Sequence, residues 1–254
     1  MIRDFTLAKY LDLCEAILTH DYLPMTVYGY LSGVHRQGQQ CAIFRHDIDR
    51  RIDHALRLAE VEAGLGISAT YYFRYPSTFY PKIIGKIKDF GHEIGYHYEV
   101  LSKTDGDMGL AIDLFAQELA EFESVCEVHT ICMHGGPLSR FDNRDLWKYH
   151  DYRDFGVAGE AYLSMVGTSF RYLTDTGRSW SGRNSIRDLL AGAGDPVPVE
   201  TTDDLIRWIG NGQKNDLYLT VHPERWAFSD WDWASGYIKD IMMNAGKRML
   251  VILR

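Results

Sequence analysis

The sequence predicts an α/β protein in which parallel strands form a barrel-like sheet with helices outside it. Short runs of β-branched and aromatic residues alternate with segments whose apolar residues recur at helical spacing, as over 52–63. The connections between these segments are short in the first half of the chain. Strand–helix–strand units of this kind favour a parallel sheet.

The first half of the chain alternates regularly between the two patterns. Thr6 can cap a first helix, whereas residues 20–40 hold Pro24 and several glycines and are expected to be irregular. Pro81 and Gly91 delimit a helix in the order that helix ends prefer. The expected elements are helices over 7–18, 52–64, 81–90 and 107–126, and strands over 41–49, 68–74, 93–98 and 129–134.

The second half is less regular, because residues 138–200 are rich in glycine, serine, arginine and aromatic residues. Thr202 can cap a helix, and a late apolar strand leads to His222. The expected elements are short strands near 156–162, 169–174 and 197–201, a helix over 202–209, a strand over 216–221, a helix over 231–245 ended by Gly246, and an apolar tail over 249–253 that can add a strand. We expect one domain over 1–254, with residues 1–40 a helical extension packed on it.

Composition limits the classes of function. A net charge of -8 without a basic stripe argues against a nucleic-acid partner. Charged residues interrupt the apolar positions of the N-terminus, and no run reaches the roughly 20 apolar residues of a membrane span, so a soluble, cytoplasmic protein is expected. The cysteines lack C-x-x-C spacing and are expected to be reduced core residues: Cys14, Cys41, Cys126 and Cys132.

Carboxylate and imidazole side chains stand at the C-terminal ends of four expected strands. Asp47 and Asp49 close the first strand and, being two apart, can face the same side of an extended backbone. His97, His134 and His222 close the third, fourth and late strands. Because the strands of a parallel barrel end at one rim, these side chains are expected to meet there.

Each of these residues also has an ordinary structural explanation. Asp49 precedes a helix and can be its N-cap, and Asp47 can pair with Arg45 or Arg50. A single histidine is more often part of ordinary structure than of a site. Three histidines and an Asp-x-Asp at four strand ends together favour a site.

This set of side chains suits a particular chemistry. Two imidazoles and a carboxylate hold zinc or another divalent first-row ion with positions open for water and substrate. Such an ion polarises a carbonyl and lowers the pKa of water, and a nearby carboxylate can accept the proton. A metal-free imidazole can protonate the leaving group, so hydrolysis of an amide or ester is predicted.

Two stretches resemble a known family. They are RHDID at 45–49 and GHEIGYH at 91–97, and they are similar to the signature phrases of the polysaccharide deacetylases, carbohydrate esterase family 4, also called the chitin-oligosaccharide deacetylase homology domain. The resemblance covers roughly residues 40–225. It implies a distorted (β/α) barrel of seven or eight units. It also implies roles: Asp47 as catalytic base, Asp49 and His97 as metal ligands, and His222 as the catalytic histidine.

The sequence departs from the family pattern at the third metal ligand. The family has a second histidine four residues after the first, and here that position is Leu101. His134 is the candidate replacement and Glu99 the alternative.

A second departure concerns the residues that orient the catalytic groups. The family's Arg-x-Pro-Tyr motif, whose arginine orients the base, is not recognisable, so Arg45 or Arg140 is expected to substitute. Asp175 is the candidate acidic partner of His222, with an ordinary turn aspartate as the alternative.

The motifs HDID, EIGYHYE and MHGGP resemble those of a subgroup associated with bacterial O-antigen and surface-polysaccharide gene clusters. The resemblance implies a metal-dependent N-deacetylase, with zinc the expected ion, acting on a nucleotide-linked or lipid-linked acylated amino sugar. Two alternatives stay open: an inactive sugar-binding homologue, and a hydrolase of another acyl group. Four tryptophans can stack on sugar rings or pack in the core: Trp180, Trp226, Trp231 and Trp233.

Overall fold

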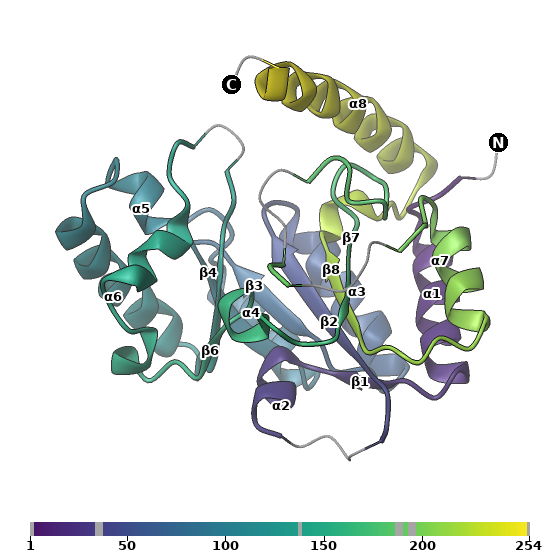
Figure 1. The fold of residues 1–254 in the computed structure, drawn as a ribbon, viewed down its shortest axis with the longest axis horizontal. Coiled ribbons are helices and arrows are strands. Elements are labelled where there is room, and N and C mark those ends of the chain that lie inside the picture. The colour runs from purple at the N-terminus through teal and green to yellow at the C-terminus, as the bar shows by residue number, and fades with distance from the viewer. Residues whose placement is uncertain (1–2, 34–37, 137–138, 186–189, 193–196, 253–254) are drawn as a thin grey trace.

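The eight strands form one all-parallel sheet. The computed structural model describes residues 3–33, 38–136, 139–185, 190–192 and 197–252. The strand order is β6-β5-β4-β3-β2-β8-β7, with β1 paired to β2 off this path. The sheet curls into an open half-barrel with helices around it, which confirms the predicted fold class (Figure 1). The strands are β1 (Leu23–Met25), β2 (Cys41–Ile48), β3 (Thr70–Phe73), β4 (Glu93–Tyr98), β5 (Thr130–Met133), β6 (Gly159–Glu160), β7 (Arg171–Thr174) and β8 (Leu217–Val221).

Helices α2 to α7 lie between successive strands, α1 precedes β1 and α8 follows β8, and the parallel strands all end on the same side of the sheet. The helices are α1 (Leu7–Thr19), α2 (Val27–Leu31), α3 (Ile52–Gly64), α4 (Pro81–Asp89), α5 (Val100–Lys103), α6 (Met108–Glu123), α7 (Thr202–Gly210) and α8 (Asp230–Ile252), with 3-10 turns η1 (Asn143–Lys148), η2 (Tyr152–Phe155), η3 (Leu163–Met165) and η4 (Pro223–Arg225).

The helix N-termini test the capping predictions. Thr6 caps α1, and its hydroxyl accepts a hydrogen bond from the backbone N–H of Lys9. Thr201, rather than Thr202, caps α7. Arg51 is the residue before α3, with φ 52° and no side-chain cap. Asp49 is therefore not the N-cap of α3.

Three expectations about secondary structure are wrong. Residues 20–40 are not merely irregular, because β1 lies there and pairs in parallel with β2. Residues 197–201 form no strand, and part of the neighbouring segment lies outside the described residues. The tail after Gly246 adds no strand up to residue 252, because α8 continues through it to Ile252. A glycine is tolerated inside a helix at a modest cost, and here it does not end one.

A buried polar cluster lies between the sheet and α3. The carboxylate of Glu62 is fully buried and accepts hydrogen bonds from the hydroxyls of Tyr10 and Tyr71 and contacts the ring of His46. A buried acid needs such partners, and this one has them at both oxygens. The four cysteines are buried and free, as predicted.

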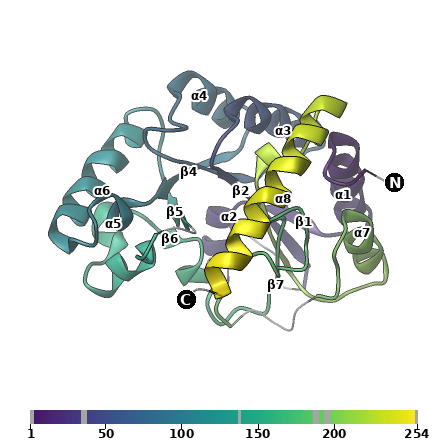
Figure 2. The same ribbon diagram turned by 90° about the horizontal axis from the view of Figure 1, so that it is seen from above.

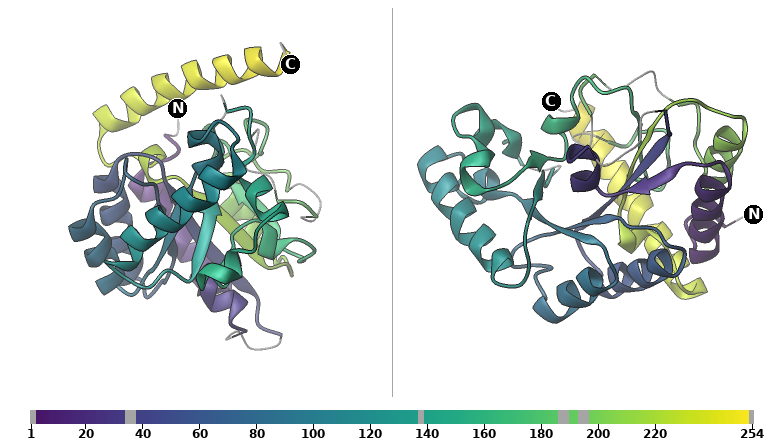
Figure 3. Two further views of the ribbon diagram at one scale, coloured as in Figure 1. Left: turned by 90° about the vertical axis from the view of Figure 1, so that its left-hand side faces the viewer. Right: turned by 90° about the horizontal axis from the view of Figure 1, so that it is seen from below.

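Helix α8 lies across one end of the molecule. It stands apart from the sheet in Figure 1, crosses in front of it in Figure 2, and runs along the top in the left view of Figure 3. Residues directly after β2 and β8 line a cavity together with residues of α8. The helix therefore lies at the end where these strands finish. No helix within the described residues has the length and apolarity to span a bilayer.

Candidate active site

Three side chains from the ends of β2, β4 and β5 converge on one point. Asp49 Oδ1 lies 3.6 Å from His97 Nε2 and 3.4 Å from His134 Nε2. The parallel register explains the meeting, because the backbone N–H of His134 continues the β4–β5 ladder by donating to the carbonyl of Tyr98. The structure thus brings together the three residues predicted as metal ligands.

Hydrogen bonds fix which ring nitrogens face this point. His97 Nδ1 lies 3.0 Å from the backbone carbonyl of Cys132, and His134 Nδ1 lies 2.9 Å from Glu99 Oε2. Each Nδ1 then carries the proton, and each Nε2 lone pair is left for a ligand. Glu99 also pairs with Arg74, so it stands behind His134 rather than beside Asp49.

The three residues fit a divalent cation. Asp49 Oδ1 is buried and has no hydrogen-bond partner. Ligand atoms about 2.0–2.2 Å from a tetrahedral zinc lie about 3.3 Å apart, close to the separations seen around this oxygen. An unpaired buried carboxylate oxygen facing two imidazole lone pairs is costly unless a cation joins them.

Asp49, His134 and Glu99 have pKa values that depend on their charged neighbours. Burial acts to raise the pKa of Asp49, but the imidazoles of His134 and His97 hold it well below its usual range. Burial acts to lower the pKa of His134, but Asp49 and Glu99 raise it. Burial acts to raise the pKa of Glu99, but the hydrogen bond from His134 and the pairing with Arg74 lower it to about 2. Both carboxylates are therefore ionised at neutral pH.

Asp47 is bound by an arginine on its own strand, Arg45. Arg45 donates to Asp47 through Nε at 2.8 Å and Nη2 at 2.6 Å, and both side chains are buried. Burial acts to raise the pKa of Asp47, but Arg45 and His97 lower it. Arg140 is not this partner, because it is exposed and pairs with Asp105.

Asp47, His97 and Cys132 form a second group of potential ligand atoms. Because Arg45 already occupies both oxygens of Asp47, this group is poorly suited to a cation.

His222 and Asp175 form a buried pair at the ends of β8 and β7. Asp175 Oδ1 lies 2.6 Å from His222 Nδ1, and its Oδ2 accepts a hydrogen bond from the His222 backbone N–H. Burial and Arg225 act to lower the pKa of His222, but Asp175 outweighs them and raises it to about 9. The pairing favours the protonated imidazole.

Two residues that the sequence analysis missed complete this pair. Arg225 Nη1 donates to Asp175 Oδ1 at 3.0 Å, and the indole N–H of Trp226 donates to Oδ2 at 2.9 Å. Both follow His222 closely in the chain, yet only the turn of η4 brings them back to Asp175. The turn-aspartate alternative for Asp175 does not account for four donors on one buried carboxylate.

Other sequence candidates lie elsewhere. Leu101 is buried in the apolar core. Trp180 and Trp226 are also core residues, so neither offers a face to a ligand. Trp233 is partly buried and donates to the backbone carbonyl of Asp4, whereas Trp231 is 79% exposed.

No protein-family model matches the chain, and no curated protein does. Among solved structures the chain is similar to a CE4-family pseudoenzyme from Bacillus anthracis, with TM-score 0.46 and 13% identity over 84% of this chain and 63% of that one. It is also similar to a family 4 carbohydrate esterase from Bacillus anthracis, with TM-score 0.42 and 12% identity over 97% and 89% of the two chains.

A third similar structure is the catalytic domain of a peptidoglycan N-acetylglucosamine deacetylase from Eubacterium rectale, with TM-score 0.44 and 12% identity over 84% and 87%. The chain thus spans less than two thirds of the pseudoenzyme's length. Such distant likenesses do not define a function.

Proposed function

We propose that this protein is a metal-dependent hydrolase that removes an N-acetyl or related acyl group from an amino sugar. The observation that carries the proposal is the buried, unpaired Asp49 Oδ1 facing the Nε2 atoms of His97 and His134. Asp47 borders this trio, with its Oδ2 3.8 Å from His97 Nε2, and His222 directly follows β8, the strand paired with β2. A cation held there, with zinc expected, would polarise the acyl carbonyl and lower the pKa of water.

Asp47 serves as the general base of this proposal. Its lowered pKa keeps it ionised, and its Oδ2 lies 3.8 Å from His97 Nε2, so it borders the trio. Arg45 fixes the orientation of both oxygens. A carboxylate so placed accepts the proton of the attacking water.

His222 serves as the general acid. A pKa of about 9 keeps its imidazole protonated at neutral pH. The proton on Nε2 passes to the nitrogen of the departing amine, while Asp175 holds the ring through Nδ1. Base and acid are then different residues, so one accepts the proton of water while the other donates a proton to the departing amine.

The class of substrate rests on sequence resemblance. The motifs at 45–49 and 91–97 support a polysaccharide deacetylase activity, and the motif MHGGP supports a role in O-antigen or surface-polysaccharide synthesis. We propose a cytoplasmic, nucleotide-linked or lipid-linked amino sugar as the substrate. His134 replaces the family histidine missing at Leu101.

Release of acetate or formate from a panel of N-acetylated, N-formylated and O-acetylated sugars tests the proposal. We expect release from at least one N-acylated sugar, loss of activity after dialysis against a chelator, and recovery on adding zinc or cobalt. Release that the chelator does not affect would contradict the metal-dependent mechanism. Sugar binding with no release from any substrate would favour the alternative of an inactive sugar-binding protein.

A further inference from the structure

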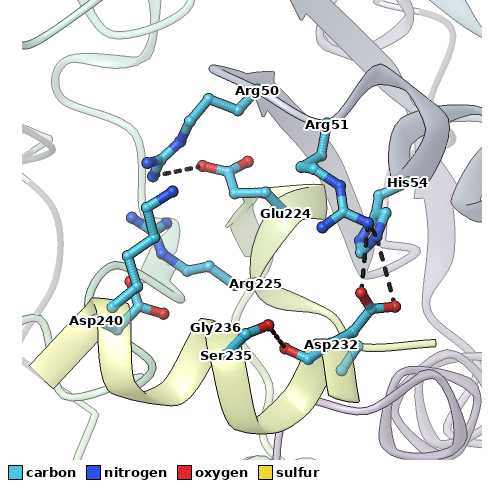
Figure 4. A pocket seen from close by; sticks show the side chains of 11 residues that line it. Arg50, Arg51, His54, Glu224, Arg225, Asp232, Ser235, Gly236 and Asp240 are labelled. Carbon is cyan, nitrogen blue, oxygen red and sulfur yellow. Dashed lines mark hydrogen bonds and ion pairs between the residues drawn. The ribbon is translucent and has the colours of Figure 1, made fainter. Parts of the chain in front are cut away.

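A cavity of about 210 Å³ lies against α8 (Figure 4). Arg50 lines it and directly follows Asp49, and Glu224 lines it two residues after His222. Burial raises the pKa of Glu224, and the negative charge of Asp49 raises it further. The cavity is thus next to the reacting groups.

Helix α8 is fixed over this cavity by polar contacts. Asp240 pairs with Arg178 at 2.7 Å, and Asp232 pairs with Arg51 at 3.5 Å. Gly236 allows the helix to approach closely, because a Cβ there would meet the guanidinium of Arg178. Helix α8, which forms one wall of the cavity, is therefore attached to the rest of the domain.

Two residues on the cavity wall have buried polar atoms without hydrogen bonds. Neither carboxylate oxygen of Glu224 has a hydrogen-bond partner, although its side chain is only 7% exposed, and its one ion pair, to Arg50, is long at 3.5 Å. The neighbouring Arg225 is also buried, and its Nε has no partner. Buried polar groups are normally satisfied, so these atoms have hydrogen-bonding capacity to offer a molecule in the cavity.

The two orphan groups require opposite partners. Glu224 offers acceptors and Arg225 Nε offers a donor, so a simple cation or a simple anion would satisfy only one of them. A hydroxyl both donates and accepts. A ring carrying adjacent hydroxyls would satisfy both.

We propose that this cavity is the subsite for the hydroxyl groups of the sugar ring, with Glu224 accepting hydrogen bonds from them and Arg225 donating. This inference rests on the proposed function for the ligand's identity as an amino sugar. Glu224 is then a substrate-binding residue, positioned so that the acyl group extends toward Asp49. The substrate class is a sugar with free hydroxyls beside the acylated nitrogen.

Stability separates a binding role from a structural role. A carboxylate without partners does not hold the fold together, so Glu224→Gln and Glu224→Ala are expected to leave the melting temperature unchanged or higher. Glu62→Gln is the control, because Glu62 is also a buried glutamate but both of its oxygens have hydrogen-bond partners. We expect that variant to melt at a lower temperature.

Binding to the metal-free protein tests the role directly and does not depend on turnover. The probes are N-acetylglucosamine and N-acetylgalactosamine, with N-cyclohexylacetamide as the analogue that lacks hydroxyls, measured by saturation-transfer NMR and calorimetry. Wild type is expected to bind at least one hexosamine. Glu224→Ala is expected to weaken that binding about 10- to 100-fold, the range for hydrogen bonds to a charged group, and to leave N-cyclohexylacetamide unaffected.

Three results would overturn the inference. They are unchanged hexosamine affinity in Glu224→Ala, a fall in its melting temperature like that of Glu62→Gln, and a wild type that binds neither hexosamine, which would leave only water in the cavity. Hexosamine binding that depends on Glu224 without any acetate release would support the subsite and refute the hydrolase. If Glu224→Ala releases acetate as fast as wild type, the hydrolase is supported and the subsite is refuted.

Discussion

Replacing Asp47 with asparagine is expected to lower the rate of deacylation by about 10² to 10⁴, the range for loss of a general base. The amide cannot accept the proton, whereas the proposed metal ligand Asp49 is untouched, so metal content should stay at the wild-type level. The variant should also be less stable by about 3–5 kcal/mol, because it removes one charge of the buried pair with Arg45. Acetate release, elemental analysis and denaturant unfolding measure the three effects.

Asp105→Asn is the control for the loss of an aspartate–arginine pair. Asp105 pairs with Arg140 at 3.1 Å, but both side chains are exposed, so neither activity nor stability should change appreciably. An Asp47→Asn protein that is folded, holds metal and works within about tenfold of wild type would show that another group is the base.

Replacing Asp175 with asparagine is expected to lower the pKa of His222 and reduce activity by about 10² to 10⁴ at neutral pH. In the wild type Asp175 raises that pKa to about 9, against burial and Arg225, which both act to lower it. Without the carboxylate, those two effects prevail, and the imidazole loses its proton at neutral pH. NMR titration of the metal-free proteins measures the pKa directly.

The same pair gives stability a defined pH dependence. Because the folded pKa of His222 lies above its ordinary value of 6.5, its contribution is complete below pH 6.5 and is lost as the pH rises through about 9. Wild type should therefore lose stability over this window, and Asp175→Asn should lose less. A His222 that still titrates near pH 9 in the variant would refute the role assigned to Asp175.

The rim of the sheet could be predicted from the sequence because it depends on local pattern and one topological rule. Asp49, His97 and His134 each stand where a β-rich run ends, and parallel strands bring such ends together. The position of His134 beside His97 follows from the same rule, since β5 pairs with β4.

What could not be predicted depends on distant chain segments. Nothing local indicates that η4 turns Arg225 and Trp226 back onto Asp175, or that α8 roofs a cavity beside Glu224. From the sequence, Asp47 could pair with more than one arginine, and the structure shows two hydrogen bonds from Arg45. Helix α8 also continues past Gly246, since glycine propensity is a weak constraint on a helix held by tertiary contacts.

The metal content of the purified protein tests the central claim most directly, measured for wild type, His134→Ala and Glu99→Gln. Wild type is expected to hold about one zinc or similar ion per chain and His134→Ala to hold none, as a site with one divalent ion and three protein ligands requires. Glu99→Gln should bind about 10- to 100-fold more weakly, as for loss of a carboxylate that supports a ligating histidine. Full occupancy in His134→Ala would move the third ligand elsewhere, and a wild type that takes up no ion when zinc, cobalt or nickel is offered would contradict the account.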